Sequence, residues 1–160
     1  MNGIIKQIFG EKRWPDREES ALIIAVCVDD RWGMRFHQRR QSQDRVLRED
    51  LLRTCGDRLL WMAPASAPLF SDHAGQIRAD SAYLQRAGTG ELCFVEDPQM
   101  KGCEERIEQV LLYRWNRTYP ADVYFTFDLT THGFTKTRSE EFRGSSHEKI
   151  TKEFYERSTG

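Results

Sequence analysis

The chain has 160 residues, of which 39% are hydrophobic, and its 24 basic and 25 acidic side chains leave a net charge of -1. This balance excludes a disordered chain and argues against a bulk nucleic-acid binder, which needs a basic face. The longest apolar run, residues 21–28, is much shorter than the ~20 residues that span a bilayer. Residues 1–20 are charged and lack a continuous apolar core, so we interpret them as an N-terminal extension rather than a secretory signal. Residues 21–160 are expected to form a single domain.

The cysteines and histidines indicate a cytoplasmic protein without a metal centre. No two cysteines have the spacing of a zinc knuckle, and Cys27 and Cys93 lie in apolar, strand-like runs, where a reduced cysteine behaves as a small hydrophobe. The 4 histidines are scattered and form no metal-binding motif. We therefore expect free thiols and no bound metal.

In chain order, the first elements are a buried strand and an amphipathic helix. The unbroken apolar run at residues 21–28 indicates a strand that is buried on both faces. Residues 44–55 carry apolar side chains at helical spacing. Ser42 or Asp44 fits the start of this helix as an N-cap, and Gly56 fits its end.

The remaining elements alternate between helix and strand, and strands dominate the last third. We expect strands at residues 58–62, 91–95, 122–128 and 150–155, and a helix at residues 81–87. Residues 103–116 fit either a helix or a buried strand. We favour the helix because Glu104 and Glu105 lie in its first turn and Arg114 and Arg117 at its end. The sequence thus predicts an α/β fold with a mostly parallel central sheet, flanking helices and a C-terminal antiparallel hairpin.

This order of elements resembles dihydrofolate reductase. Residues 22–34, LIIAVCVDDRWGM, are similar to that family's first strand and the entry to its mobile substrate loop. Residues 59–66, LLWMAPAS, resemble its second strand and the turn that follows, and residues 134–157 resemble its closing antiparallel strands. The resemblance extends in order over residues 21–157 and implies a dihydrofolate-reductase-like fold, a nicotinamide cofactor and a pterin substrate.

The chain departs from this family where the cofactor would bind. The family holds the pyrophosphate with a Gly-Gly turn at a helix N-terminus, where the backbone can approach it closely. The corresponding residues here are Glu96, Asp97 and Pro98, which place two carboxylates near the pyrophosphate and remove an amide donor. An alternative alignment, with that strand at residues 110–113, also lacks the glycines. NADPH is therefore the disfavoured cofactor, and the sequence points to no other.

An arginine-rich segment is the first candidate for binding. Residues 31–48 contain arginines at six positions, and the planar guanidinium group suits phosphate or carboxylate. In the resembled fold this segment overhangs the ligand cleft, which implies a small anionic, nucleotide-like ligand; a solvated charged loop over residues 35–43 would give the same pattern. Residues 113–119, where arginines alternate with aromatics, fit either a stacked base or the end of a helix. The expected ligand-binding residues are Arg39, Arg40, Ser42, Asp44, Arg114 and Asn116.

Asp44 and His147 are the candidate catalytic residues. Asp44 lies near the position at which the family uses a carboxylate to bind and help protonate the pterin. A histidine is the natural general base near neutral pH. The side chains of residues 145–149 diverge in a loop, so these residues do not form a ready-made catalytic pair.

Three functions follow from these residues. The first is a protein that binds a small anionic ligand in an arginine-lined cleft without the usual NADPH site. The second is an NADPH-dependent, pteridine-type reductase that uses other cofactor contacts. The third is a hydrolase of nucleotides or nucleic acid, with Asp44 or His147 as the base. We rank them in this order because Glu96 and Asp97 disfavour a pyrophosphate. No membrane partner is expected, and nucleic acid is not the favoured partner.

Overall fold

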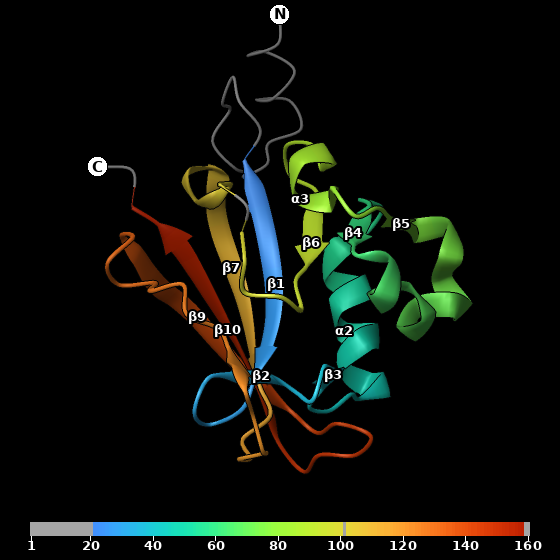
Figure 1. Cartoon of the computed structure of the whole chain (residues 1–160), viewed down its shortest axis with the longest axis vertical. Helices are drawn as coiled ribbons and strands as arrows, with labels where there is room; N and C mark the ends of the chain where they lie inside the picture. Colours follow the sequence, from blue (N-terminus) through green and yellow to red (C-terminus); the bar gives the residue numbers. More distant parts are fainter. Residues whose placement is uncertain (1–20, 101, 159–160) are drawn as a thin grey trace, which may run out of the picture.

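A twisted sheet forms the centre of the molecule (Figure 1). The structure is a computed structural model that describes residues 21–100 and 102–158. The strands of the sheet are β1 (Leu22–Val28), β4 (Leu60–Met62), β5 (Ile77–Ala79), β6 (Leu92–Phe94), β7 (Ile107–Arg114), β9 (Phe134–Phe142) and β10 (Ile150–Arg157). Within the described residues their order is β5-β4-β6-β1-β7-β10-β9. The first five strands of this order run parallel, and β10 runs antiparallel to β7 and β9. The predicted parallel sheet with a C-terminal antiparallel hairpin is confirmed.

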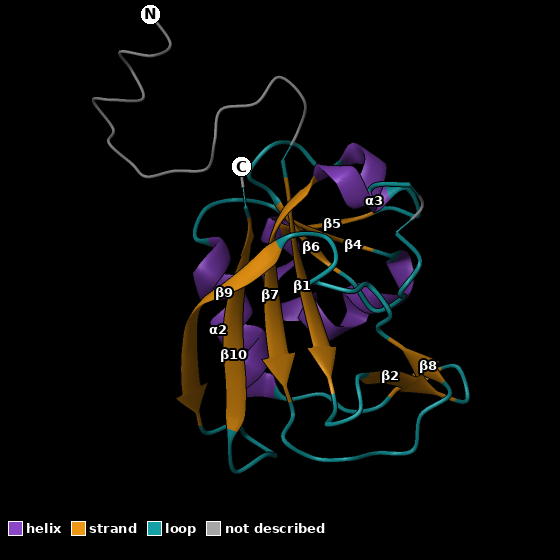
Figure 2. Ribbon diagram, turned by 90° about the vertical axis from the view of Figure 1, so that its left-hand side faces the viewer, coloured by secondary structure: helices purple, strands orange, loops and turns teal. Residues whose placement is uncertain are grey.

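Both faces of the sheet are covered. Helix α2 (Arg45–Cys55) packs its buried side chains against Ile23 and Ala25 of β1, and Leu22 and Ile24 of the same strand face a second core on the other side. Figure 2 shows α2 behind β10 and β7. Helix α3 (Tyr83–Arg86) contributes to the second core. The apolar run is therefore continuous because each side chain of residues 22–28 meets one of two cores.

Two of the three predicted helices form, and α2 follows the sequence signals closely. Asp44 is its N-cap and accepts hydrogen bonds from the backbone N–H groups of Val46 and Leu47. Gly56 ends it with a φ of 65°, in the left-handed region that glycine adopts without strain. Helix α3 is shorter than the expected residues 81–87. Two 3₁₀ segments complete the connections, η1 (Pro64–Gln76) and η2 (Glu104–Arg106).

Residues 103–116 correct the helix that we favoured there. They form η2 and then β7, which hydrogen-bonds to β1 on one side and to β10 on the other. Val110 and Leu112 enter one core, whereas Leu111 and Tyr113 enter the other. An apolar run with two buried faces suits a central strand, and this burial outweighs the arrangement of charges at its ends.

Residues 35–43, which the sequence suggested as a loop, contribute to a small second sheet. Strands β2 (Gly33–Phe36) and β3 (Arg39–Arg40) form a hairpin, and β8 (Val123–Tyr124) pairs with β2. The hairpin turns at His37 and Gln38, which have positive φ values of 52° and 65°. Only β8 is a regular strand within the expected residues 122–128. Figure 2 shows β2 and β8 set apart from the main sheet, beyond the end of β1.

The predicted N-terminal extension, residues 1–20, lies outside the described residues. In the described part of the chain, none of the helices combines the length and the apolar character needed to cross a membrane. All four cysteines are free thiols, and three of them are buried. The prediction of unpaired cysteines is confirmed.

Candidate functional site

A small pocket lies where β1, β6 and β7 end. Cys27 of β1, Phe94 at the end of β6, and Trp115 just after β7 contribute to its wall. Its volume is about 30 Å³, which is enough for roughly one or two water molecules. In the main sheet, β4, the next strand after β1 in the chain, lies on one side of β1. Strand β7 pairs with β1 on the other side. In open α/β sheets, ligands bind outside the carboxyl ends of the strands at such a reversal of strand order.

The opposite wall of the pocket is the segment from β3 to the first turn of α2. It contributes Arg40, Gln41, Ser42, Gln43, Asp44, Leu47 and Arg48. The backbone here is held by Gln41, whose side-chain amide donates to Asp29 at 3.0 Å and to the carbonyl of Pro120 at 3.2 Å. Three predicted ligand-binding residues, Arg40, Ser42 and Asp44, therefore lie on one wall of the pocket.

Arg40 is paired across the pocket with Glu96, the residue that follows Val95 at the end of β6. Its Nε and Nη2 atoms donate to the two carboxylate oxygens at 2.7 and 2.9 Å. The hydroxyl of Ser66 donates to the same carboxylate at 2.6 Å. The hydrogen bonds that Arg40 donates to Glu96 raise the pKa of its guanidinium, although burial opposes this. The carboxylate of Glu96 therefore neutralises Arg40 and joins the two walls.

Arg48 is the second arginine of the pocket wall. Its Nη1 atom donates to the side-chain carbonyl of Gln43 at 3.1 Å. It makes no ion pair with a carboxylate of the described residues. Among the described residues, the pocket thus contains one arginine that is neutralised by a carboxylate, Arg40, and one that is not, Arg48. Arg48 was not singled out as a ligand-binding residue, because on sequence it belongs to the polar face of the helix.

The other expected ligand-binding residues lie elsewhere. Arg39 is exposed on the hairpin and is not among the residues that line the pocket. Arg114 donates to Glu153 at 3.0 Å and stacks on Trp32 with its guanidinium carbon 4.7 Å from the ring centre. Asn116 donates to the backbone carbonyl of Lys149 at 3.1 Å. The structure does not bring these three side chains to the pocket.

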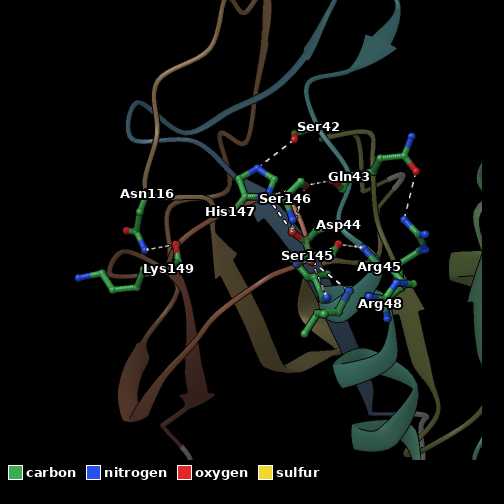
Figure 3. Close-up of polar contacts among 12 residues, drawn as sticks. Ser42, Gln43, Asp44, Arg45, Arg48, Asn116, Ser145, Ser146, His147 and Lys149 are labelled. Atoms are coloured by element: carbon green, nitrogen blue, oxygen red, sulfur yellow. Dashed lines mark hydrogen bonds and ion pairs between the residues drawn. The ribbon is translucent and has the colours of Figure 1, made fainter.

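Asp44 lies at the centre of a buried hydrogen-bond network (Figure 3). Besides capping α2, its carboxylate accepts from the backbone N–H groups of Ser145 and Ser146, both at 2.8 Å, and from Nδ1 of His147 at 2.9 Å. Burial raises the pKa of this carboxyl, but the hydrogen bonds from His147, Ser146, Ser145 and Leu47 outweigh burial and hold the pKa well below its usual range. Asp44 is therefore an ionised carboxylate, and its side chain has 0% exposure.

His147 links this carboxylate to two hydroxyl groups. Its Nε2 atom lies 3.1 Å from Oγ of Ser42 and 2.9 Å from the hydroxyl of Tyr119. Because Nδ1 faces the ionised Asp44, we assign the proton to Nδ1, and Nε2 then accepts from both hydroxyls. The ring of Trp115 stacks on the imidazole with the ring centres 4.5 Å apart. His147 is thus fixed in orientation and 2% exposed, with Ser42 between it and the pocket.

The structure therefore brings together three predicted residues whose contact the sequence did not predict. Ser42 and Asp44 belong to the arginine-rich segment, whereas His147 is more than a hundred positions away. Sequence analysis missed Tyr119 and Trp115 as partners of the histidine, and their only signal was the aromatic segment at residues 113–119. Across the described residues, no group of three or more His, Cys, Asp or Glu side chains is arranged to hold a metal ion.

Comparison with known proteins shows the fold. No protein-family profile matches the sequence, and no curated protein matches it significantly. Among solved structures, dihydrofolate reductase from Enterococcus faecalis, complexed with NADP(H) and RAB-propyl, matches with a TM-score of 0.64. The match covers 86% of this chain and 96% of that one, at 10% sequence identity. The chain therefore has a dihydrofolate-reductase-like fold, as the sequence resemblance predicted, and at this identity the match shows the fold only.

The packing of Gly144 against Asp44 gives a first prediction. A Cβ atom on Gly144 would lie 2.7 Å from Cγ of Asp44 and 2.7 Å from Cδ1 of Ile150. Gly144→Ala must therefore push residues 144–147 away from the carboxylate, and we expect the free energy of unfolding to fall by about 1–3 kcal/mol. Gly75→Ala is the matched control, because its Cβ would meet nothing within 4 Å. Urea unfolding measures both, and equal effects would contradict the packing described.

The lowered pKa of Asp44 gives a second prediction. A carboxyl whose pKa is lower in the folded state contributes stability above its usual pKa of 3.8, and this stability is lost as the pH falls towards the folded value. Asp44→Asn puts an amide donor opposite N–H donors and should cost about 3 kcal/mol at pH 7. The difference from the wild type should shrink below pH 4 in urea unfolding measured from pH 7 to pH 3. The exposed Asp57→Asn is the control, and a pH-independent loss in Asp44→Asn would refute the assignment.

Proposed function

We propose that this chain binds a small anionic ligand of nucleotide-like chemistry in the pocket at the ends of β1, β6 and β7. The observation that carries the proposal is the pair of arginines, Arg40 and Arg48, on one wall of this pocket. Guanidinium groups bind phosphate and carboxylate through two parallel hydrogen bonds. Arg48 donates only to the neutral Gln43 among the described side chains, so its charge is free to act on an anion.

The ligand enters by replacing Glu96 as the partner of Arg40. A volume of about 30 Å³ is far too small for a nucleotide, so the walls must separate. The contact that joins them is the Arg40–Glu96 pair, whose side chains are 28% and 15% exposed. An ion pair that water reaches contributes little net stability, typically up to about 1 kcal/mol. A phosphate group that offers the same two-oxygen geometry can therefore take over the guanidinium at small cost.

The residues at the end of β6 do not fit a nicotinamide dinucleotide. The carboxylate of Glu96 lies in the pocket, and Asp97 and Pro98 follow it. Between β6 and β7 the described residues contain the 3₁₀ segment η2 and no α-helix whose N-terminus would receive a pyrophosphate. We therefore propose a ligand other than NADPH.

Thermal unfolding with a ligand panel tests the proposal. The panel contains inorganic phosphate, mononucleotides, dinucleotides, NADPH and folate. A ligand at one hundred times its dissociation constant adds about 2.7 kcal/mol, which raises the melting temperature by several degrees. We expect a shift with phosphate-bearing compounds. A shift with NADPH and with no other compound would instead support the reductase, and a panel without any shift would contradict the proposal.

Variants of the pocket give the third prediction. Arg48→Ala should weaken binding of the shifting compound at least tenfold, because a hydrogen bond to a charged group contributes about 1.5–3 kcal/mol. Glu96→Gln should tighten it, since it removes a repelling charge and releases Arg40. Arg39→Ala is the matched control and should bind as the wild type does. Titration calorimetry measures all three; weaker binding by Glu96→Gln, or equal losses in Arg39→Ala and Arg48→Ala, would disprove the arrangement.

A further inference from the structure

A serine, a histidine and a buried carboxylate lie in line at the edge of the pocket. Oγ of Ser42 is 3.1 Å from Nε2 of His147, and Nδ1 of the same ring is 2.9 Å from Oδ2 of Asp44. Figure 3 shows the three side chains, with the imidazole between the hydroxyl and the carboxylate. They come from the β3–α2 connection, the N-cap of α2 and the β9–β10 connection. This is the order of groups that activates a serine for nucleophilic attack.

We propose that Ser42 is a nucleophile for acyl transfer, with His147 as its general base and Asp44 as the residue that positions the base. The substrate class is a small carboxylic ester; its anionic part lies against Arg48, and this last element rests on the proposed function. Ser42 lines the pocket and is half-buried, so a ligand there can touch its hydroxyl. His147 and Asp44 have side chains that are 2% and 0% exposed, so they act through Ser42.

The charge state of the network gives the imidazole the correct tautomer. The backbone N–H groups of Ser145, Ser146 and Leu47 hydrogen-bond to the carboxylate of Asp44 and keep it ionised. An ionised carboxylate at 2.9 Å holds the proton on Nδ1 of His147, which leaves the lone pair of Nε2 directed at Oγ of Ser42. The stacked ring of Trp115 keeps the imidazole in this plane. The base is therefore oriented before any substrate arrives.

The reaction balances with water as the second reactant. Oγ of Ser42 attacks the carbonyl carbon of the ester while its proton passes to Nε2 of His147. The imidazolium gives this proton to the departing alkoxide, which leaves as the alcohol, and the acyl group stays on Ser42. Water then attacks the acyl carbon and gives a proton to Nε2; this proton returns to Oγ as the carboxylic acid leaves. Asp44 stays ionised throughout and stabilises the imidazolium.

The hydroxyl of Tyr119 competes with that of Ser42 for Nε2 of His147. The tyrosine hydroxyl lies 2.9 Å from the same Nε2 atom, so in the resting protein it shares the lone pair with Ser42. If His147 activates Ser42, removal of the tyrosine hydroxyl leaves Nε2 to accept a hydrogen bond from Ser42 alone. If His147 instead only holds Tyr119 in place, Ser42 reacts as an ordinary serine does. The labelling rate of Ser42 distinguishes the two cases.

The test is covalent labelling of the full chain with a fluorophosphonate probe, followed by intact mass and peptide mapping. We expect one label per chain, on Ser42, and a burst of p-nitrophenolate from p-nitrophenyl acetate. Ser42→Ala should lose the label, and His147→Gln should react at least one hundred times more slowly. Tyr119→Phe should label faster than the wild type, because Nε2 of His147 then accepts from Ser42 alone. The exposed Ser81→Ala is the control and should label as the wild type does. The wild-type rate should rise with pH to a plateau that is absent from His147→Gln.

Three results would overturn the proposal. The variant must have the circular dichroism spectrum and the melting transition of the wild type. The three results are no label on the wild type, a label on a residue other than Ser42, and an unchanged rate in His147→Gln. A phosphate-induced shift in melting temperature, measured on Ser42→Ala, separates this proposal from the binding function. If the wild type takes no label and the phosphate shift is present, the nucleophile is overturned and the binding function stands. A label without any shift supports the nucleophile and removes the role of Arg48.

Discussion

The buried carboxylate of Asp44 is the interaction on which the site depends. An ionised group with no exposure to water is tolerated only when hydrogen-bond donors surround it. Here the donors come from two parts of the chain, the first turn of α2 and residues 145–147. One side chain thus begins a helix and also fastens the β9–β10 connection to it. Gly144 completes the arrangement, because any larger residue would occupy the space of the carboxylate.

A second acid–base contact, Arg40–Glu96, holds the other end of the same wall. The two contacts differ in their access to water: the Arg40–Glu96 pair is partly exposed, whereas Asp44 and His147 are not. A partly exposed pair exchanges partners at low cost, whereas a buried one resists separation. The proposed opening of the pocket would therefore move the hairpin end of the wall and leave the α2 end in place. Ser42 lies between these two contacts, next to the end that stays fixed.

Sequence patterns predicted the features that depend on neighbouring residues. The apolar run of β1 and the N-cap at Asp44 are local signals, since burial on two faces and capping of the first turn each involve a few consecutive residues. Residues 103–116 were assigned wrongly because their charges fit a helix, while the decisive fact, pairing with both β1 and β10, is not local. In the site, too, local features were predicted and long-range contacts were not. Ser42, Asp44 and His147 were each selected, but their contact depends on the sheet order, which no short pattern encodes.

The same carboxylate limits what can be transferred from the resemblance. In that family an acid early in the first helix touches the substrate, and Asp44 occupies the start of the corresponding helix here. Its side chain has 0% exposure and its oxygens already accept from four backbone N–H groups and an imidazole, so it cannot also donate a proton to a ligand. The acid at this position therefore acts on a histidine instead of on a substrate. In our proposal the reactive group of the pocket is therefore the hydroxyl of Ser42 and not this carboxylate, on a sheet that has the dihydrofolate reductase fold.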